Sequence, residues 1–159
     1  MSFDDWILSL HVLSAFAYMG ALVLFWILVV AVRRTDLPVV TARMGPVART
    51  GNVAVAVGAV GTIVSGVWLA ISLDAYEVWD GWVIAAIVLW AISLETGRRA
   101  GTEYTNAMNK AEELEVSGQT GPSAELAAMN RTSTGLLMHT VSSIVALAIL
   151  IDMIWKPGA

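Results

Sequence analysis

Four long apolar runs, separated by charged connections, constrain this chain more than any other feature. They cover residues 6–32, 52–73, 78–95 and 135–155, and none carries a charge in its central part. A helix needs about 20 apolar residues to cross a hydrocarbon core of ~30 Å. Because backbone polar groups in lipid must pair within their own segment, we expect these runs to be helices rather than strands. The sequence therefore predicts an all-α, four-helix transmembrane bundle of up-down topology.

The composition agrees with burial in lipid. The chain has 159 residues, of which 57% are hydrophobic and only 14% charged, and its mean hydropathy is +0.72. Soluble domains are about one quarter charged. The length fits a single integral membrane domain over residues 1–159, whose partner is the lipid bilayer. Without cysteine there is no disulfide or thiolate site, and without a basic cluster there is no sign of nucleic acid.

The basic residues predict the orientation of the bundle. Eight of the nine lie in the first and third connections, which the positive-inside rule makes cytoplasmic. These eight are Arg33, Arg34, Arg43, Arg49, Arg98, Arg99, Lys110 and Arg131. We expect four tryptophans to form an interfacial belt on the opposite side: Trp6, Trp79, Trp82 and Trp155. Both termini should then lie outside a plasma membrane.

The third connection, residues 98–134, has a helical pattern of its own. Tyr104, Met108, Ala111 and Leu114 recur at helical spacing among charged residues. Pro122 suits the first turn of a second helix, and no breaker separates that helix from the last span. We predict a cytoplasmic helical hairpin with a tight turn at 117–121. It is either a solvated spacer or an arm that docks a partner.

Small residues recur along the second span. Gly51, Gly58, Ser65 and Ser72 are spaced seven apart, which predicts a seam along which another helix approaches closely.

The only two histidines, His11 and His139, each lie inside a span. An ionisable residue there indicates function by default, whereas the alternative is a neutral imidazole that bonds a neighbouring helix. Ser14 and Tyr18 share the helix face of His11, and Gly135 shares that of His139. This face leaves room for a flat ligand such as haem b with an imidazole axial ligand, or equally for another helix. These five residues are the candidate cofactor site, with the two histidines as metal ligands.

The depths of the two histidines limit that site. They differ by roughly 20 Å along the membrane normal at the helical rise per residue. The difference in depth therefore argues against one haem held between both imidazoles and favours two separate sites, or one site and one structural histidine. The sequence shows no nucleophile motif, phosphate loop or carboxylate dyad, so we do not expect an enzyme acting by itself.

The segments "LHVLSAFAYMGALVL" and "DMIWKPG" resemble a group of uncharacterised four-span bacterial membrane proteins. That group is distantly similar to copper-resistance D type proteins and to haem J type protoporphyrinogen oxidases. The resemblance implies a helical bundle with a haem-associated histidine in the first span, at the position of His11. The oxidase pattern also has a lysine in the third span, and residues 78–94 contain neither Lys nor Arg. This departure from the pattern argues against the oxidase activity and leaves haem binding open.

Three hypotheses follow. The chain is a haem-b-binding protein or a subunit of a membrane electron-transfer complex, a cofactor-free accessory subunit, or a small transporter or metal-handling protein. Its further partners would be other membrane subunits or a second copy.

Overall fold

A computed structural model describes residues 2–73 and 77–157. The described residues form helices only, in the order α1 (Phe3–Arg33), α2 (Pro38–Ser72), α3 (Gly81–Val116), α4 (Ala124–Asn130) and α5 (Ser133–Trp155). Four helical segments are long and apolar enough to cross a membrane: α1, α2, α3, and α4 taken together with α5. The predicted all-α fold with four apolar spans is confirmed.

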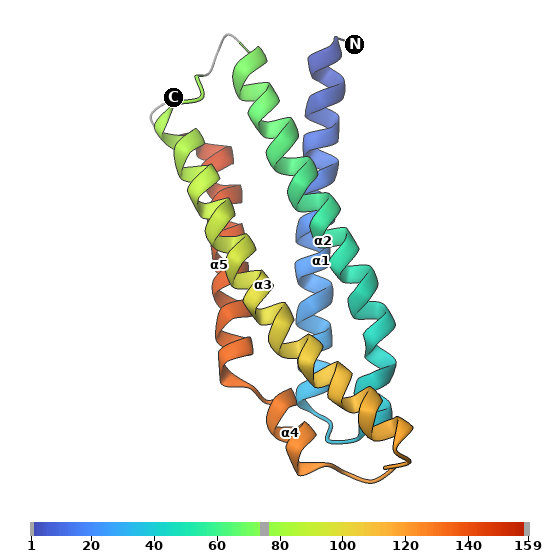
Figure 1. The fold of residues 1–159 in the computed structure, drawn as a ribbon. Helices are drawn as coiled ribbons and strands as arrows, with labels where there is room; N and C mark the ends of the chain where they lie inside the picture. Colours follow the sequence, from blue (N-terminus) through green and yellow to red (C-terminus); the bar gives the residue numbers. More distant parts are fainter. Residues whose placement is uncertain (1, 74–76, 158–159) are drawn as a thin grey trace.

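The bundle consists of two helix pairs (Figure 1). α1 packs along α2, and α3 packs along α5, while α2 and α3 join the pairs and the backbones of α1 and α5 approach closely at few positions. Both chain ends and the α2–α3 connection lie at one end of the bundle, and α4 lies at the other.

The seam of small residues in α2 forms the α1–α2 interface, as predicted. A Cβ atom added at Gly58 would lie 2.5 Å from the backbone nitrogen of Tyr18, and one added at Gly61 would meet the Ser14 hydroxyl. Ser72 donates a hydrogen bond to Asp4 at 3.0 Å, near the chain-end side. Close backbone approach through small residues supplies the packing that holds membrane helices together.

The first connection is shorter than the sequence suggested. α2 begins at Pro38, so Arg43 and Arg49 lie on the helix and not in a loop, and the second helix is far longer than residues 52–73. Proline is tolerated in the first turn because its missing N–H group has no partner there, and this allows the early start. The helix continues through Pro46, so only residues 34–37 link α1 to α2.

α3 runs without a break from the third span into the hairpin, as predicted, and ends in a Schellman motif. Gly118 has a φ of +82°, which favours glycine. The Gln119 N–H donates to the Leu114 carbonyl and the Gly118 N–H to the Glu115 carbonyl, both at 3.0 Å. The tight turn predicted at 117–121 is confirmed by these two bonds.

The segment that follows the turn of the hairpin differs from the prediction. We expected one helix from Pro122 into the last span, but α4 ends at Asn130 and α5 begins at Ser133. The Thr132 hydroxyl accepts a hydrogen bond from the Gly135 N–H at 3.3 Å, and so caps a new helix where we had found no breaker. Pro122 lies outside α4, whose N-cap is Ser123.

The hairpin packs against the rest of the chain. The Asn130 side chain donates to the Thr35 carbonyl at 3.1 Å and to the Thr41 hydroxyl at 3.0 Å. Leu126 is fully buried against Ala42 of α2 and Ala111 of α3. The hairpin is thus fixed to the α1–α2 connection and is not a freely solvated spacer.

Three of the four tryptophans predicted to form the interfacial belt lie at the surface of the structure. Trp6, Trp79 and Trp155 are well exposed, whereas Trp82 is only 6% exposed. Trp82 turns inward because it packs with Ala70 and Val83 beside the space between the helix pairs.

Candidate functional site

Two cavities lie between the helix pairs, and each is lined by one histidine. The first, the His11 cavity, has a volume of about 260 Å³ and extends past Trp82 toward Lys156. The second, the His139 cavity, has a volume of about 440 Å³ and extends toward the hairpin. The two cavities share no lining residue. The structure therefore places the two imidazoles in separate surroundings, as the expected difference in depth required.

His11 is held by α2 through one ring nitrogen. Its Nδ1 lies 3.0 Å from the carbonyl oxygen of Thr62 and 3.2 Å from the hydroxyl oxygen of Ser65. A carbonyl only accepts, so Nδ1 carries the proton and Nε2 keeps its lone pair. Metal-binding histidines are oriented in this way, with one nitrogen on a backbone carbonyl and the other on the metal.

The small residues beside His11 mostly make room for α2. A Cβ atom added at Gly66 would lie 3.0 Å from Cε1 of His11, and Ser14 lies against Gly61. Ser14 does not line the His11 cavity, and Tyr18 lines the other one. The space that remains for a ligand lies on the side of His11 that faces the second helix pair.

Tyr18 belongs to a hydroxyl network in the middle of the bundle. The Ser93 hydroxyl donates to the Ser142 carbonyl at 2.9 Å, and the Ser142 hydroxyl donates to the Ser93 carbonyl at 2.8 Å. Because the single proton of Ser93 is committed, the Tyr18 hydroxyl is the donor in its 2.8 Å bond to Ser93. This network links α1 to the α3–α5 pair.

The imidazole ring of His139 packs against the indole ring of Trp26. Its ring lies 4.7 Å from the Trp26 ring, centroid to centroid, at an interplanar angle of 51°. The Trp26 N–H is committed to the Ser143 hydroxyl at 2.8 Å. The Nε2 atom of His139 is buried without a hydrogen-bond partner among the described residues. Gly135, predicted to border His139, contacts Tyr104 and Thr132 and lines neither cavity.

Sequence reasoning missed several of the residues that build these sites. Thr62 contributes only its backbone carbonyl. No sequence pattern marks a residue that acts through its backbone. The sequence could have indicated Ser93, because a lone hydroxyl in an apolar run must find a hydrogen-bond partner within the membrane. Met153 lines the His11 cavity from α5, and nothing in its spacing indicated this.

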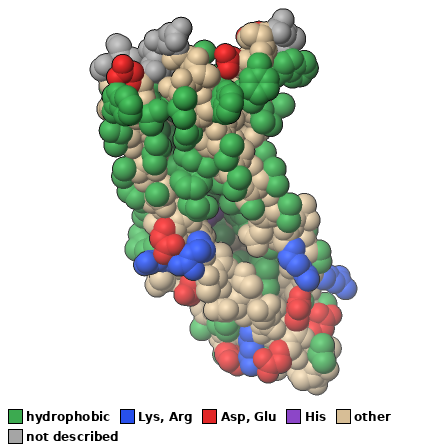
Figure 2. Space-filling view, turned by 45° about the horizontal axis from the view of Figure 1, so that its top comes forward, with side chains coloured by type: hydrophobic (Ala, Val, Ile, Leu, Met, Phe, Trp, Pro, Cys, Tyr) green, Lys and Arg blue, Asp and Glu red, His purple; other side chains and the backbone are tan. Residues whose placement is uncertain are grey.

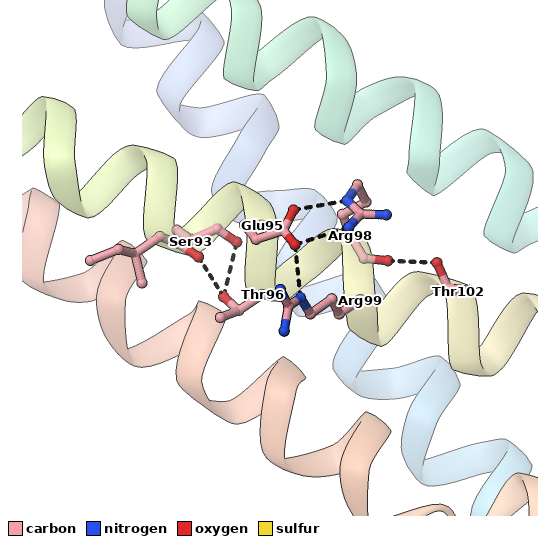
Figure 3. A network of polar contacts seen from close by, with 7 residues as sticks. Ser93, Glu95, Thr96, Arg98, Arg99 and Thr102 are labelled. Carbon is pink, nitrogen blue, oxygen red and sulfur yellow. Dashed lines mark hydrogen bonds and ion pairs between the residues drawn. The ribbon is translucent and has the colours of Figure 1, made fainter.

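An ion cluster borders the His139 cavity and is called here the boundary cluster: Glu95, Arg98 and Arg99. Both arginines contact the one carboxylate, at 2.8 Å for Arg98 and 2.7 Å for Arg99 (Figure 3). Glu95 thus pairs with both arginines. The hydrogen bond with Glu95 raises the pKa of Arg98 above its ordinary value. Figure 2 shows a histidine at the bottom of a hollow beside a cluster of basic and acidic side chains.

Among the described residues, no group of three or more His, Asp or Glu side chains is arranged to hold a metal ion. Each histidine could thus supply one ligand to a metal but not a complete protein-only site.

Four apolar helices, a polar hairpin at one end and cavities between helix pairs define the class of this chain, an integral membrane protein. Its residues 5–157 match the model of one family, described as predicted integral membrane protein (DUF2269), and the chain belongs to that family. No curated protein and no solved structure matches it.

Proposed function

We propose that the protein binds haem b in the His11 cavity, by itself or as a subunit of a membrane electron-transfer complex. The observation that carries the proposal is the arrangement of His11. Its Nδ1–H is fixed on the Thr62 carbonyl, which leaves Nε2 as the ligand atom at an apolar cavity. The resemblance of the first span to the haem J type proteins supports the same residue.

The other walls of the His11 cavity suit a porphyrin. Trp82, Trp90 and Ile87 supply apolar surface, and Lys156 supplies a cation for a propionate group. Met153 lines the cavity from the other helix pair, and its thioether would be a candidate second ligand. The cavity of about 260 Å³ is below the usual range for ligand sites, so haem binding there would require the helix pairs to move apart. Bound there, haem supplies one-electron chemistry, and the protein supplies its ligands and an apolar surrounding.

His139 is the weaker ligand candidate. Among the described residues, its Nε2 atom is buried without a hydrogen-bond partner, whereas the Thr62 carbonyl orients the ring of His11. The distribution of basic residues supports a plasma-membrane orientation in which the hairpin is cytoplasmic and both termini are outside.

The test is the visible absorption spectrum of the protein purified from cells supplied with a haem precursor. We expect a Soret band, its loss in His11→Ala, and a shifted reduced spectrum in Met153→Leu. Ser65→Ala is the matched control, because it removes a hydroxyl beside the imidazole but keeps the ring and the Thr62 contact. A wild-type protein without a Soret band, or a band unchanged in His11→Ala, would refute the proposal.

A cofactor-free accessory subunit is the second candidate, and one observation favours it. The imidazole of His11 already serves packing, since it joins α1 to α2 through Thr62 and Ser65. This function predicts no Soret band, together with a stable membrane partner that comigrates in native gels.

A further inference from the structure

We propose that the His139 cavity is an aqueous inlet, which admits water and small hydrophilic solutes from the hairpin side to the middle of the membrane span and is closed there. This inference does not rest on haem binding, because it concerns the other cavity. It does not rest on the orientation of the bundle either, because the hairpin itself marks the side. Polar and charged groups at membrane depth are tolerated where they line a water-filled space.

The first argument is the short apolar part of α3. Its uncharged stretch from Gly81 to Leu94 spans roughly 20 Å at the helical rise per residue, whereas the hydrocarbon core is about 30 Å thick. Even with Gly81 at the edge of the core, roughly six further residues of α3 must lie within it. The boundary cluster falls in this stretch, and its Arg98 lines the cavity. Ionised side chains at that depth require water beside them.

The contacts of α1 indicate the same depth. The Tyr18 hydroxyl bonds Ser93 at 2.8 Å, and Ser93 lies only two residues before Glu95. From Tyr18, α1 continues toward the hairpin without a charge as far as Val32, over roughly 20 Å. The charged part of α3 therefore begins at a level where α1 is still within its apolar span. Water between the helix pairs reconciles the two helices.

The walls of the cavity on the hairpin side of Glu95 suit water. Asn52, Thr102 and Asn106 line the cavity and are exposed. Gly101 also lines it, and a Cβ atom added there would meet nothing within 4 Å. The volume of about 440 Å³ has room for roughly ten to fifteen water molecules at about 30 Å³ each. Figure 2 shows the hollow at the surface, beside basic and acidic side chains.

His139 lies deeper in this space. Its ring lines the cavity, and its Nε2 atom is buried without a hydrogen-bond partner among the described residues. A buried polar atom that lacks a protein partner ordinarily bonds a water molecule. Arg98 already makes two hydrogen bonds with Glu95, so it does not hold a ligand of its own in the cavity. The lining therefore suits mobile water better than a hydrocarbon chain or one tightly bound ion.

The inlet is closed at the level of Tyr18. The hydroxyl protons of Tyr18, Ser93 and Ser142 are committed to one another or to backbone carbonyls. The Tyr18 ring also packs in an apolar cluster with Ala59 and Ala146. Because the two cavities share no lining residue, the inlet ends at this cluster and does not continue into the His11 cavity.

The test is the reaction of single cysteines with sulfonatoethyl methanethiosulfonate, a charged thiol reagent that does not enter lipid. The chain has no cysteine of its own, so each variant carries one target. Ala56 lines the cavity from α2, two residues from Gly58, which contacts Tyr18. Val57 is 63% exposed and lines neither cavity, so it is the control at the same depth.

In proteoliposomes we expect Ala56→Cys to react at least about tenfold faster than Val57→Cys, because the reactive thiolate forms in water. A second pair lies on α3, where Leu94 lines the cavity and Ile92 does not, with exposed fractions of 37% and 43%. Leu94→Cys should likewise react faster than Ile92→Cys. Equal rates within the pairs would mean that lipid or packed side chains fill the cavity, and would overturn the proposal.

Two further arms test the side and the route. Gln119→Cys, in the exposed turn of the hairpin, marks the hairpin side. Reagent confined to one face of the membrane should modify Ala56→Cys only from the face on which it modifies Gln119→Cys. Gly101→Leu fills the cavity and should slow the reaction of Ala56→Cys severalfold. Gly20→Leu, equally unobstructed but outside both cavities, is its control.

Either of two results in these arms would overturn the inlet. Modification of Ala56→Cys from the face opposite the hairpin would show that the inner end is open. An unchanged rate in Gly101→Leu would show that the reagent reaches position 56 by a route outside the cavity.

Discussion

The two histidines show how differently the α1–α2 interface and the space between the helix pairs are built. At the interface His11 donates to a backbone carbonyl and lies over Gly66, where an added Cβ atom would lie 3.0 Å from its ring. In the space between pairs His139 packs against Trp26, and its buried Nε2 has no partner among the described residues. The same residue type thus bonds a neighbouring helix in one place and keeps an unpartnered nitrogen in the other, although each borders a cavity.

The largest expected effect on the free energy of unfolding comes from replacing one glycine in each of the two regions. Gly58→Ala places a Cβ atom 2.5 Å from the Tyr18 backbone, so α1 and α2 must separate, at a cost of about 2–3 kcal/mol in the free energy of unfolding. Gly101→Ala, which enters open space, should instead stabilise α3 by about 0.5–1 kcal/mol. Unfolding by SDS titration in mixed micelles measures both. Similar values for the two variants would contradict the contrast between the regions.

Replacing each histidine by leucine tests the comparison directly. His11→Leu loses a hydrogen bond between helices and should cost about 1–2 kcal/mol. His139→Leu removes a buried group without a hydrogen-bond partner, so the stability of the cofactor-free protein should stay unchanged or rise. The same SDS titration serves here. A larger loss for His139→Leu than for His11→Leu would show that the region around His139 is the more tightly built.

Tyr18→Phe addresses the contact between the two pairs. It removes the hydroxyl that donates to Ser93 while keeping the ring, and should cost about 0.6 kcal/mol, the average for such bonds between membrane helices. Ser93→Ala in the Tyr18→Phe background completes a double-mutant cycle, which should give a coupling energy of similar size. No coupling would mean that the pairs are held together elsewhere.

The smallest effect is expected in the hairpin. Arg49→Gln breaks an exposed ion pair with Glu112 at 3.4 Å, and such pairs contribute about 0–0.5 kcal/mol. The shift in melting temperature should be within error at high salt. A loss comparable to that of Tyr18→Phe would indicate that the ion pair, and not Leu126 packing, fixes the hairpin to α2.

The fold could be predicted from the sequence wherever one physical requirement decides the structure. Charge-free runs long enough for the bilayer can only be helices, and small residues seven apart must lie along a neighbour, as Gly58 does against Tyr18. The break between α4 and α5 was missed because Thr132 is an N-cap only when its hydroxyl turns back to Gly135. The early start of α2 was missed because Pro38 and Pro46 normally argue against a helix interior.

The candidate site was less predictable because it depends on how the pairs are spaced. Spacing along α1 correctly placed His11 and Tyr18 on one face, yet the two residues border different cavities. Trp82 and Met153 turn toward the His11 cavity through contacts between distant helices. No local pattern encodes such volumes, since they are what remains after the helices have packed.

The continuity of α3 has a mechanical consequence. The helix has 36 residues and spans about 54 Å, of which the part from Glu95 to Val116 takes about 32 Å. As a stiff rod, α3 moves its far tip by roughly 5–6 Å for a tilt of about 10° within the bilayer. Because Leu126 and Asn130 fix the hairpin to α2 and to the α1–α2 connection, a change in the tilt of α3 would strain these contacts.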